Sequence, residues 1–255
     1  MVLAVLPTHR AFRAAVSPTT VVVMDTITVI TGGNKGLGLE SARRLKEAGH
    51  TVLIGARDAE RGRAAADELG VICLSLDVTD QASVDAAAER VRSEYGRLDV
   101  LINNAGITGS FQPLEQTSAE DAGAVLDTNV LGVMRVTNAF VPLLAESEHA
   151  RIVNVTSAVG SFAATLDYDS FDWHIVPPVY ALSKTALSML TLKYSRALSG
   201  MRVNVTDPGY TRTDLNGGAG DHDVTAGTDG IMRLATLDAG GPTGTVIGGH
   251  GALPW

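Results

Sequence analysis

Short apolar runs rich in Val, Ile and Leu alternate with longer segments of helical spacing along most of the chain. Runs of this length predict strands, and segments whose apolar residues recur every three or four positions predict helices. Seven strands are predicted, at Ile27–Thr31, Thr51–Gly55, Val71–Leu76, Leu98–Ile102, Arg151–Thr156, Met201–Thr206 and Thr245–Ile247. The predicted helices are Gly36–Ala48, Asp58–Leu69, Thr79 or Asp80 to Tyr95, Thr117–Leu144 with a disturbance near Gly132, Pro177–Leu198 and Val224–Leu237.

Strands that are apolar on both faces and alternate with helices indicate a parallel sheet covered on both sides. Right-handed crossovers then produce a doubly wound α/β sheet of the Rossmann type. Neither a linker nor an internal repeat interrupts residues 25–255, so a single domain is predicted there.

The first 24 residues differ from the rest, because they contain Arg10 and Arg13 but no acidic residue. The first strand pattern begins just after Met24. We therefore expect residues 1–24 to be a disordered or non-native extension, with Met24 as the functional start. An organelle transit peptide is the alternative.

The composition excludes some classes of function. Hydrophobic residues make up 45% of the chain, which suits a globular protein with a sizeable core. The net charge of −8 argues against a general nucleic-acid binder, which needs a basic face. Cys73 is the only cysteine, so no intrachain disulfide can form, and no apolar run approaches the ~20 residues of a membrane span. We expect a cytoplasmic protein without a metal site.

A glycine-rich loop follows the first predicted strand and predicts a dinucleotide site. Ligands of open parallel sheets bind beyond the carboxyl ends of the strands, where the strand order reverses. Glycines there let the backbone approach a pyrophosphate, which the N-terminus of the next helix attracts. The spacing is not G-x-G-x-x-G, and a tight turn without a ligand is the alternative. The candidate residues are Gly32, Asn34, Lys35, Gly36, Leu37 and Gly38.

The end of the second strand predicts the choice of cofactor. An acid there would accept a hydrogen bond from a ribose 2′-hydroxyl, whereas an arginine would accommodate a 2′-phosphate. Ala56 occupies the tip and Arg57 follows it, while Lys35 lies in the glycine loop. These cations favour NADP(H) over NAD(H), although Asp58 could pair with Arg57 and weaken the preference.

The chain resembles the short-chain dehydrogenase/reductase family over about nine tenths of its length. The resemblance is carried by Thr31–Gly38, Asp77 in Leu76-Asp77-Val78, Asn103-Asn104-Ala105-Gly106, Asn129, Ser157, Tyr180-x-x-x-Lys184 and Pro208-Gly209. Lys35 and the ending Leu253-Pro254-Trp255 resemble the NADPH-dependent carbonyl reductases of that family.

The resemblance implies further cofactor contacts. Asp77 and Val78 would border the adenine, and backbone groups of Asn103, Ala105 and Gly106 would line the cofactor. The segment with Pro208, Gly209, Thr211 and Thr213 would close over the nicotinamide. Taken alone, Asp77 could instead be a turn or capping carboxylate, and the Asn-Asn-Ala-Gly segment a plain turn. Asp207, directly before Pro208, has no role in this interpretation.

Tyr180 and Lys184 are four positions apart and would share one face of a helix. A nearby ammonium favours the phenolate form of a tyrosine. The resemblance implies that Tyr180 exchanges a proton with the substrate oxygen and that Ser157 hydrogen-bonds that oxygen. It also implies that Lys184 holds the nicotinamide ribose and that Asn129 links Lys184 to solvent through a water. Each of these residues alone has an ordinary structural explanation, and only the ordered set predicts catalysis.

The segment between Ser157 and Tyr180 is longer than in the common family pattern. It contains several of the few aromatic residues of the chain and is predicted to form a wall or lid of the substrate site. A surface loop with locally packed aromatics is the alternative. The candidate substrate contacts are Phe162, Trp173 and, after the sixth strand, Tyr210.

These observations predict an oxidoreductase that transfers hydride between NADP(H) and a ketone, aldehyde or secondary alcohol. The alternative is an NADP(H)-binding regulatory protein that does not turn over substrate. The family often forms dimers, so a homodimer is one expectation. The alternative is that the long segment before Tyr180 interferes with the helix pairing on which such dimers depend.

Overall fold

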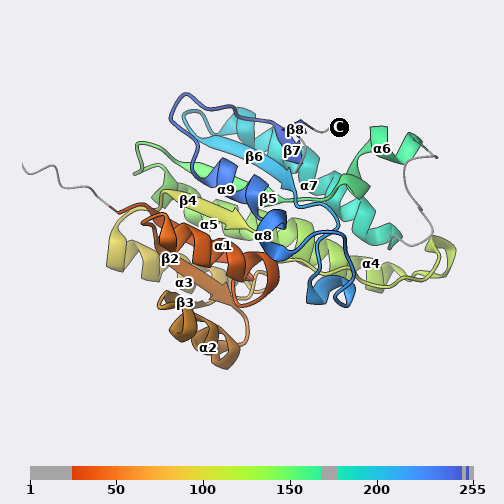
Figure 1. Ribbon diagram of the computed structural model, residues 1–255, viewed down its shortest axis with the longest axis horizontal. Helices are drawn as coiled ribbons and strands as arrows, with labels where there is room; N and C mark the ends of the chain where they lie inside the picture. The colour runs from red at the N-terminus through yellow and green to blue at the C-terminus, as the bar shows by residue number, and fades with distance from the viewer. Residues whose placement is uncertain (1–24, 168–176, 249–250, 253–255) are drawn as a thin grey trace, which may run out of the picture.

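A single sheet forms the centre of the computed structural model, which describes residues 25–167, 177–248 and 251–252. Seven strands are parallel, and a short antiparallel strand is added at one edge, in the order β3-β2-β1-β4-β5-β6-β7-β8 (Figure 1). The described strands are β1 (Ile27–Thr31), β2 (Thr51–Ala56), β3 (Ile72–Ser75), β4 (Val100–Asn103), β5 (Arg151–Val155), β6 (Arg202–Asp207), β7 (Val246–Gly248) and β8 (Gly251–Ala252). The predicted doubly wound α/β sheet is confirmed.

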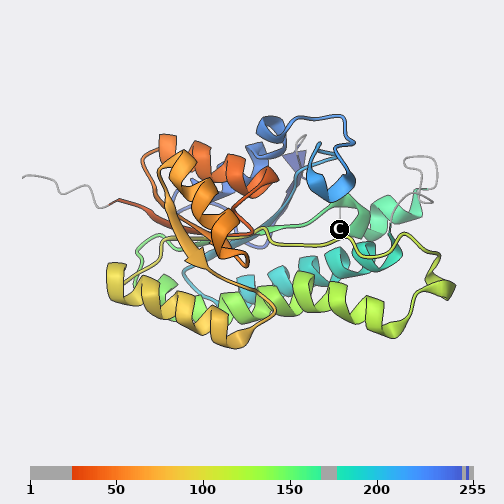
Figure 2. The same cartoon turned by 90° about the horizontal axis from the view of Figure 1, so that it is seen from below.

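Helices cover both faces of this sheet (Figure 2). One face carries α1 (Gly36–Glu47), α2 (Ala59–Leu69), α8 (Val224–Gly227) and α9 (Asp229–Ala235). The other face carries α3 (Gln81–Tyr95), α4 (Ala119–Leu126), α5 (Gly132–Leu144) and α7 (Pro178–Ala197). A short helix, α6 (Phe162–Leu166), follows β5 and has no clear signal in the sequence pattern.

Alternate strand residues face opposite helical layers, because successive side chains of a strand point to opposite sides. Val29 and Leu101 pack into the layer with α3 and α5, whereas Ile30 and Ile102 pack into the layer with α1 and α9. All four are fully buried. The unbroken apolar runs of the sequence therefore correspond to strands that contribute to two cores.

The predicted long helix Thr117–Leu144 is interrupted where the sequence indicated a disturbance. A π-helical turn at Asp127–Leu131 separates α4 from α5, which begins at Gly132. A Cβ atom on Gly132 would lie 2.9 Å from Cγ2 of Val78, so only glycine allows this close packing. The π turn carries Asn129, which is 1% exposed. Such turns often occur at functional sites.

The strand order reverses between β1 and β4. The loops after β1, β4, β5 and β6 therefore open at the same edge of the sheet, where ligands of this architecture bind. Among the described helices, none combines the length and apolar character needed to cross a membrane. Residues 1–24, Trp173 and the ending Leu253-Pro254-Trp255 lie outside the described part of the chain.

Candidate active site

The glycine loop is tied to the segment after β4 by a set of short polar contacts. The hydroxyl of Thr31 accepts hydrogen bonds from the backbone N–H groups of Asn104 and Ala105, each at 3.0 Å. The amide of Asn104 donates to the carbonyls of Thr31 and Gly32, each at 3.0 Å. These contacts fix the two loops that border the reversal of the strand order. The sequence motif contained Asn104 but did not reveal that its side chain joins the two loops.

Two glycines of the loop are required by its geometry. Gly36 has a φ of +54° and opens helix α1. A Cβ atom on Gly38 would lie only 2.4 Å from the carbonyl oxygen of Gly32, so no other residue fits there. Lys35, at the N-cap position of α1, provides no side-chain cap, and the first turn has no acidic residue. The N-terminus of α1 therefore presents uncapped N–H groups and a positive dipole end, which fit a pyrophosphate.

The two candidate cations lie in different surroundings. Lys35 forms an exposed ion pair with Asp214 of the segment after β6, at 3.2 Å. Arg57 is exposed, and no carboxylate among the described residues pairs with it. Asp58 does not weaken the charge of Arg57 by pairing, because its carboxylate caps α2 through the N–H groups of Glu60 and Arg61.

Asp77 forms the turn that its sequence allowed, and its contact with an adenine stays a prediction. Its Oδ1 accepts from the N–H of Thr79 at 2.9 Å and from the hydroxyl of Thr79 at 2.7 Å, which closes a turn. These bonds, aided by the charge of Arg57, lower the pKa of Asp77, so the carboxylate stays ionised. The backbone N–H of Asp77 is held by Ser83 at 2.9 Å. Val78 is buried against Gly132.

The side chain of Asn103 points into a buried polar layer rather than towards the cofactor loop. Its amide donates to Asn154 Oδ1 at 2.8 Å and to Thr137 Oγ1 at 3.2 Å. Asn154 in turn donates to Thr191 of α7 at 2.8 Å. Asn103 can therefore reach a cofactor only through its backbone, as expected. The remaining candidates of the glycine loop, Asn34 and Leu37, are half-buried.

Both polar atoms of the Asn129 side chain form hydrogen bonds. Its Oδ1 accepts from the N–H of Ile107 at 2.9 Å, and its Nδ2 donates to the carbonyl of Ile107 at 2.9 Å. The same Nδ2 donates to Ser183 Oγ at 2.9 Å, and Ser183 donates to the carbonyl of Tyr180 at 2.7 Å. Asn129 thus joins the loop after β4 to the start of α7. The role of Ser183 was not predicted from the sequence.

Lys184 is 4% exposed, and its ammonium donates to the carbonyl of Val155 at 2.8 Å. A Cβ atom on Gly106 would lie 3.3 Å from Asn129 Oδ1 and 3.7 Å from Lys184 Nζ. The backbone of Gly106 therefore lies close to both side chains. The water link between Asn129 and Lys184 stays a prediction.

The Tyr180 ring centroid lies 5.3 Å from Lys184 Nζ. Burial lowers the pKa of Lys184 to about 8, and the negative charge of Asp207 partly opposes this effect. Burial also raises the pKa of Tyr180, and Asp207 adds to the rise. The expectation that the ammonium makes Tyr180 a better phenolate is therefore wrong for this structure, because burial dominates. The phenol is protonated, which is the form that can donate a proton.

Ser157 lies two residues after β5 in an extended conformation and precedes a 3₁₀ turn at Ala158–Gly160. A Cβ atom on Gly160 would lie 2.8 Å from Lys184 Cβ, so this turn packs directly against α7. The half-buried Ser157 hydroxyl makes no hydrogen bond to any residue that the structure describes. The hydroxyl is therefore available to a bound substrate.

The segment after β6 lies over the glycine loop. Thr213 Cγ2 would be 3.6 Å from a Cβ atom on Gly36. The hydroxyl of Thr211 is buried and donates to the carbonyl of Pro208 at 2.8 Å. Gly209 has a φ of +68°, which lets the chain turn sharply here. Thr213 is half-buried, and its backbone N–H donates to Asn216 Oδ1 at 3.1 Å in a capping box.

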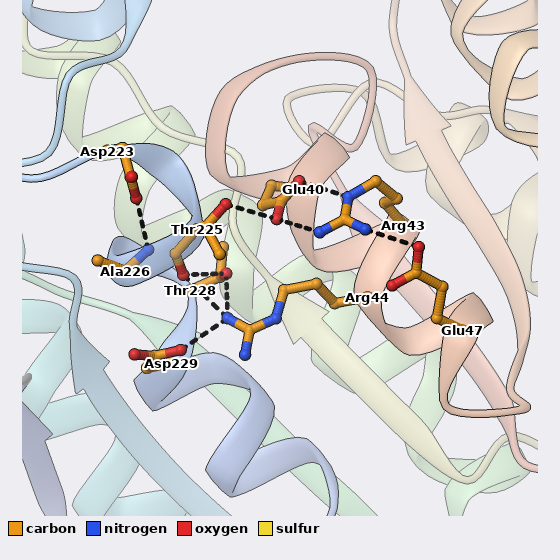
Figure 3. Close-up of polar contacts among 9 residues, drawn as sticks. All are labelled: Glu40, Arg43, Arg44, Glu47, Asp223, Thr225, Ala226, Thr228 and Asp229. Atoms are coloured by element: carbon orange, nitrogen blue, oxygen red, sulfur yellow. Dashed lines mark hydrogen bonds and ion pairs between the residues drawn. The ribbon is translucent and has the colours of Figure 1, made fainter.

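Helix α1 anchors this segment through two of its charged residues (Figure 3). Arg44 Nη1 donates to Thr228 Oγ1 at 2.8 Å and to Asp229 Oδ1 at 2.7 Å. The hydroxyl of Thr225 donates to Glu40 at 2.9 Å. Helix α8 is thereby held against the helix that opens the glycine loop.

The two described candidates for substrate contact are exposed. Phe162 of α6 is 70% exposed and Tyr210 is 44% exposed. They lie in the segments that follow β5 and β6 at the carboxyl edge of the sheet, and Trp173 lies outside the described residues. The same edge carries further exposed apolar residues, namely Phe111, Leu114, Leu166 and Leu215. In the described part of the chain, no group of three potential metal ligands gathers at this or any other site.

Comparisons with known proteins agree with this arrangement. A model of the short chain dehydrogenase family matches residues 26–223. The chain is 35% identical over 229 residues to the short-chain dehydrogenase anuI of Penicillium roqueforti (strain FM164), covering 84% of this chain and 90% of that protein. It is 28% identical to the (+)-neomenthol dehydrogenase of Capsicum annuum, covering 85% and 93% of the two chains.

The fold is similar to that of the NADPH-bound carbonyl reductase from chicken fatty liver. The TM-score is 0.80 at 26% identity, covering 91% of this chain and 100% of that chain. Because the family model spans most of the sequence and the fungal relative matches over nearly its whole length, this chain belongs to the short-chain dehydrogenase family.

Proposed function

We propose that the protein is an NADPH-dependent reductase of ketones or aldehydes, which can also oxidise the corresponding secondary or primary alcohols. The observation that carries the proposal is the convergence of Tyr180, Lys184 and Ser157 at the edge that also holds the glycine loop. Tyr180 and Lys184 share one face of α7, and the 3₁₀ turn that Ser157 precedes packs against Lys184.

In the proposed reaction, separate residues donate the proton, orient the carbonyl oxygen and restore the proton. A bound NADPH would supply the hydride to the carbonyl carbon. Tyr180 donates its phenolic proton to the carbonyl oxygen, so the carbonyl becomes an alcohol. Ser157 donates a hydrogen bond to the same oxygen and fixes it near Tyr180. Lys184 replaces the lost proton most readily below its pKa of about 8, where it is an ammonium.

The glycine loop, the N-terminus of α1 and the backbone at Gly106 would hold the cofactor. Arg57, which has no carboxylate partner among the described residues, would meet the 2′-phosphate. Lys35 would join it by leaving Asp214, since an exposed ion pair is worth little. The NADPH bound to the chicken carbonyl reductase supports this choice of cofactor.

The test is oxidation of NADPH and of NADH by the purified protein across aldehydes, ketones and quinones. Tyr180→Phe should lower turnover by about 10²-fold or more, because it removes the proton donor, while binding of NADPH is unchanged. Equal activity with NADH at low concentration would contradict the cofactor assignment. Binding of NADPH without any turnover would favour the regulatory protein instead.

We also propose that two copies pair through the faces of α5 and α7. Four large apolar residues of these helices and of the π turn before α5 are exposed, namely Leu131, Met134, Leu182 and Met189. The hydroxyl of Tyr194 in α7 donates to Asn138 of α5 at 2.7 Å, which holds the two helices together as one surface. An exposed apolar surface of this kind is typical of association sites.

A further inference from the structure

Two arginines lie side by side at the amino end of the sheet, which is the end opposite the glycine loop. Arg151 begins β5 and Arg202 begins β6, and the two residues are in register on neighbouring parallel strands. Neighbouring strands lie ~5 Å apart, so the two side chains leave the same face of the sheet close together. Like charges directly opposite each other are destabilising, so this pair requires a physical explanation.

The turn after α9 satisfies only part of the hydrogen-bonding capacity of the two arginines. Arg151 Nε donates to the carbonyl of Leu237 at 2.6 Å, and Arg202 Nη2 donates to the carbonyl of Ala239. A guanidinium has five N–H donors, and each of these side chains forms one hydrogen bond within the described structure. Nε of Arg202 is buried and has no partner among the described residues. Since buried donors are normally paired, the two guanidiniums keep an unused capacity for an acceptor.

The carboxylates nearby do not neutralise this pair by contact. Glu148 and Asp238 are exposed and line the same hollow, but neither forms an ion pair with either arginine in the described part of the chain. Asp99 and Asp238 attract Arg151 from a distance, yet burial outweighs both and lowers the pKa of the Arg151 guanidinium. The two positive charges are therefore partly withdrawn from water without a counter-charge in contact with them.

A hollow of about 20 Å³ is lined by both arginines. The rest of its wall comes from residues 148–150 before β5, from Gly200 and from residues 237–239 after α9. This volume has room for about one water-sized atom. An oxygen atom that enters the hollow would meet N–H donors from two guanidiniums, whose geometry matches carboxylate and phosphate oxygens. A compact oxyanion that inserts one oxygen and keeps the others in water therefore fits this hollow.

We propose that the hollow lined by Arg151 and Arg202 is a binding site for a small oxyanion, with inorganic phosphate as its simplest ligand. The anion neutralises the repulsion between the two guanidiniums. It also joins the starts of β5 and β6 to the turn after α9. Because the site lies at the end of the sheet opposite Tyr180 and the glycine loop, its occupancy does not depend on the proposed reductase function.

Thermal unfolding of the full chain in phosphate and in chloride, at equal ionic strength, tests the proposal. About 20 mM phosphate should raise the Tm by about 2–4 °C relative to chloride, the shift expected when the ligand is about tenfold above its dissociation constant. Arg151→Gln and Arg202→Gln each remove one guanidinium and should lose at least about half of this shift. The matched control is Arg233→Gln in α9, because this exposed arginine forms no side-chain hydrogen bond in the described structure. It should keep the whole shift.

The N-terminus of α1 is a second place where phosphate can bind, so hydrogen exchange of the wild-type protein locates the ligand. Phosphate should slow exchange at residues 237–239 by about threefold or more, and this measurement also decides the matter if neither glutamine variant folds. A wild-type Tm that phosphate does not raise would overturn the proposal. A shift that both variants retain in full, or slower exchange confined to the glycine loop, would overturn it as well, because the phosphate would then bind elsewhere.

Discussion

At the scale of single residues, burial of Lys184 is a costly feature of the site. Its pKa falls from an ordinary 10.5 to about 8 because the ammonium leaves water. Each tenfold loss of proton affinity corresponds to ~1.36 kcal/mol, so the folded state loses about 3 kcal/mol at neutral pH. The hydrogen bond to Val155 returns about 1 kcal/mol. Burial of the Lys184 ammonium beside Tyr180 therefore lowers the stability of the folded protein.

We predict that Lys184→Met stabilises the protein at pH 7 by about 1–3 kcal/mol while abolishing reduction. Between pH 8 and 10.5 the unfolded wild-type chain binds more protons than the folded one at this group, so wild-type stability from Lys184 rises with pH. The advantage of Lys184→Met should therefore shrink over this range. Urea unfolding at pH 7 and pH 10 measures it, with the exposed Lys193→Met of α7 as the control. An advantage that is the same at both pH values would contradict the argument.

Asn129 illustrates how a residue found by resemblance can have a structural role that spacing does not reveal. Its amide satisfies both backbone groups of Ile107 and the hydroxyl of Ser183. We predict that Asn129→Ala lowers the free energy of unfolding by about 2–3 kcal/mol, since it leaves buried groups unpaired. Hydrogen exchange at Ile107 should quicken. Gln112→Ala is the matched control, because it removes an exposed amide that forms no side-chain hydrogen bond among the described residues. Unaltered exchange at Ile107 would show that Asn129 does not hold the backbone of the loop after β4.

At the scale of elements, the contacts between α1 and α8 hold the segment after β6 over the glycine loop (Figure 3). We predict that Arg44→Ala raises the KM for NADPH by about 3- to 10-fold and quickens hydrogen exchange in α8 and α9, because three hydrogen bonds are lost. Arg92→Ala is the control, since in the described part of the chain Arg92 bonds only to Glu89 within α3. If both variants behave alike, the segment is held by other contacts.

The strands and most helices could be predicted because apolar runs, helical spacing and terminal glycines in the local sequence determine them. Ile27–Thr31 is apolar throughout and became a fully buried strand, and Gly96 ends α3 with a φ of +72°. The π turn at Asn129 could be located only as a disturbance, and the close packing of Gly132 on Val78 beside it joins residues far apart in sequence. The hydrogen bonds of Asn104 also depend on strands brought together by the fold. The phenolate expectation failed for the related reason that burial is not visible in spacing.

At the scale of the whole molecule, the distribution of exposed apolar side chains distinguishes two regions. One lies in the connecting segments at the carboxyl edge of the sheet and includes Phe162 and Tyr210. The other lies on helical faces and includes Leu182 and Met189 of α7. The first region borders the proposed site and suits an apolar substrate. The second lies on the helical layer away from α1, so a partner there would leave the mouth of the site open.

We predict that the protein is a homodimer in solution and that Leu182→Glu combined with Met189→Glu converts it to a monomer. Two buried charges facing their symmetry mates would cost far more than the apolar contact they replace. Sedimentation equilibrium measures the mass directly. Leu114→Glu, which places the same charge on a 63% exposed residue of the connecting segments, should leave the dimer intact. A wild-type protein that sediments as a monomer, or a double variant that still sediments as a dimer, would exclude this face as the interface.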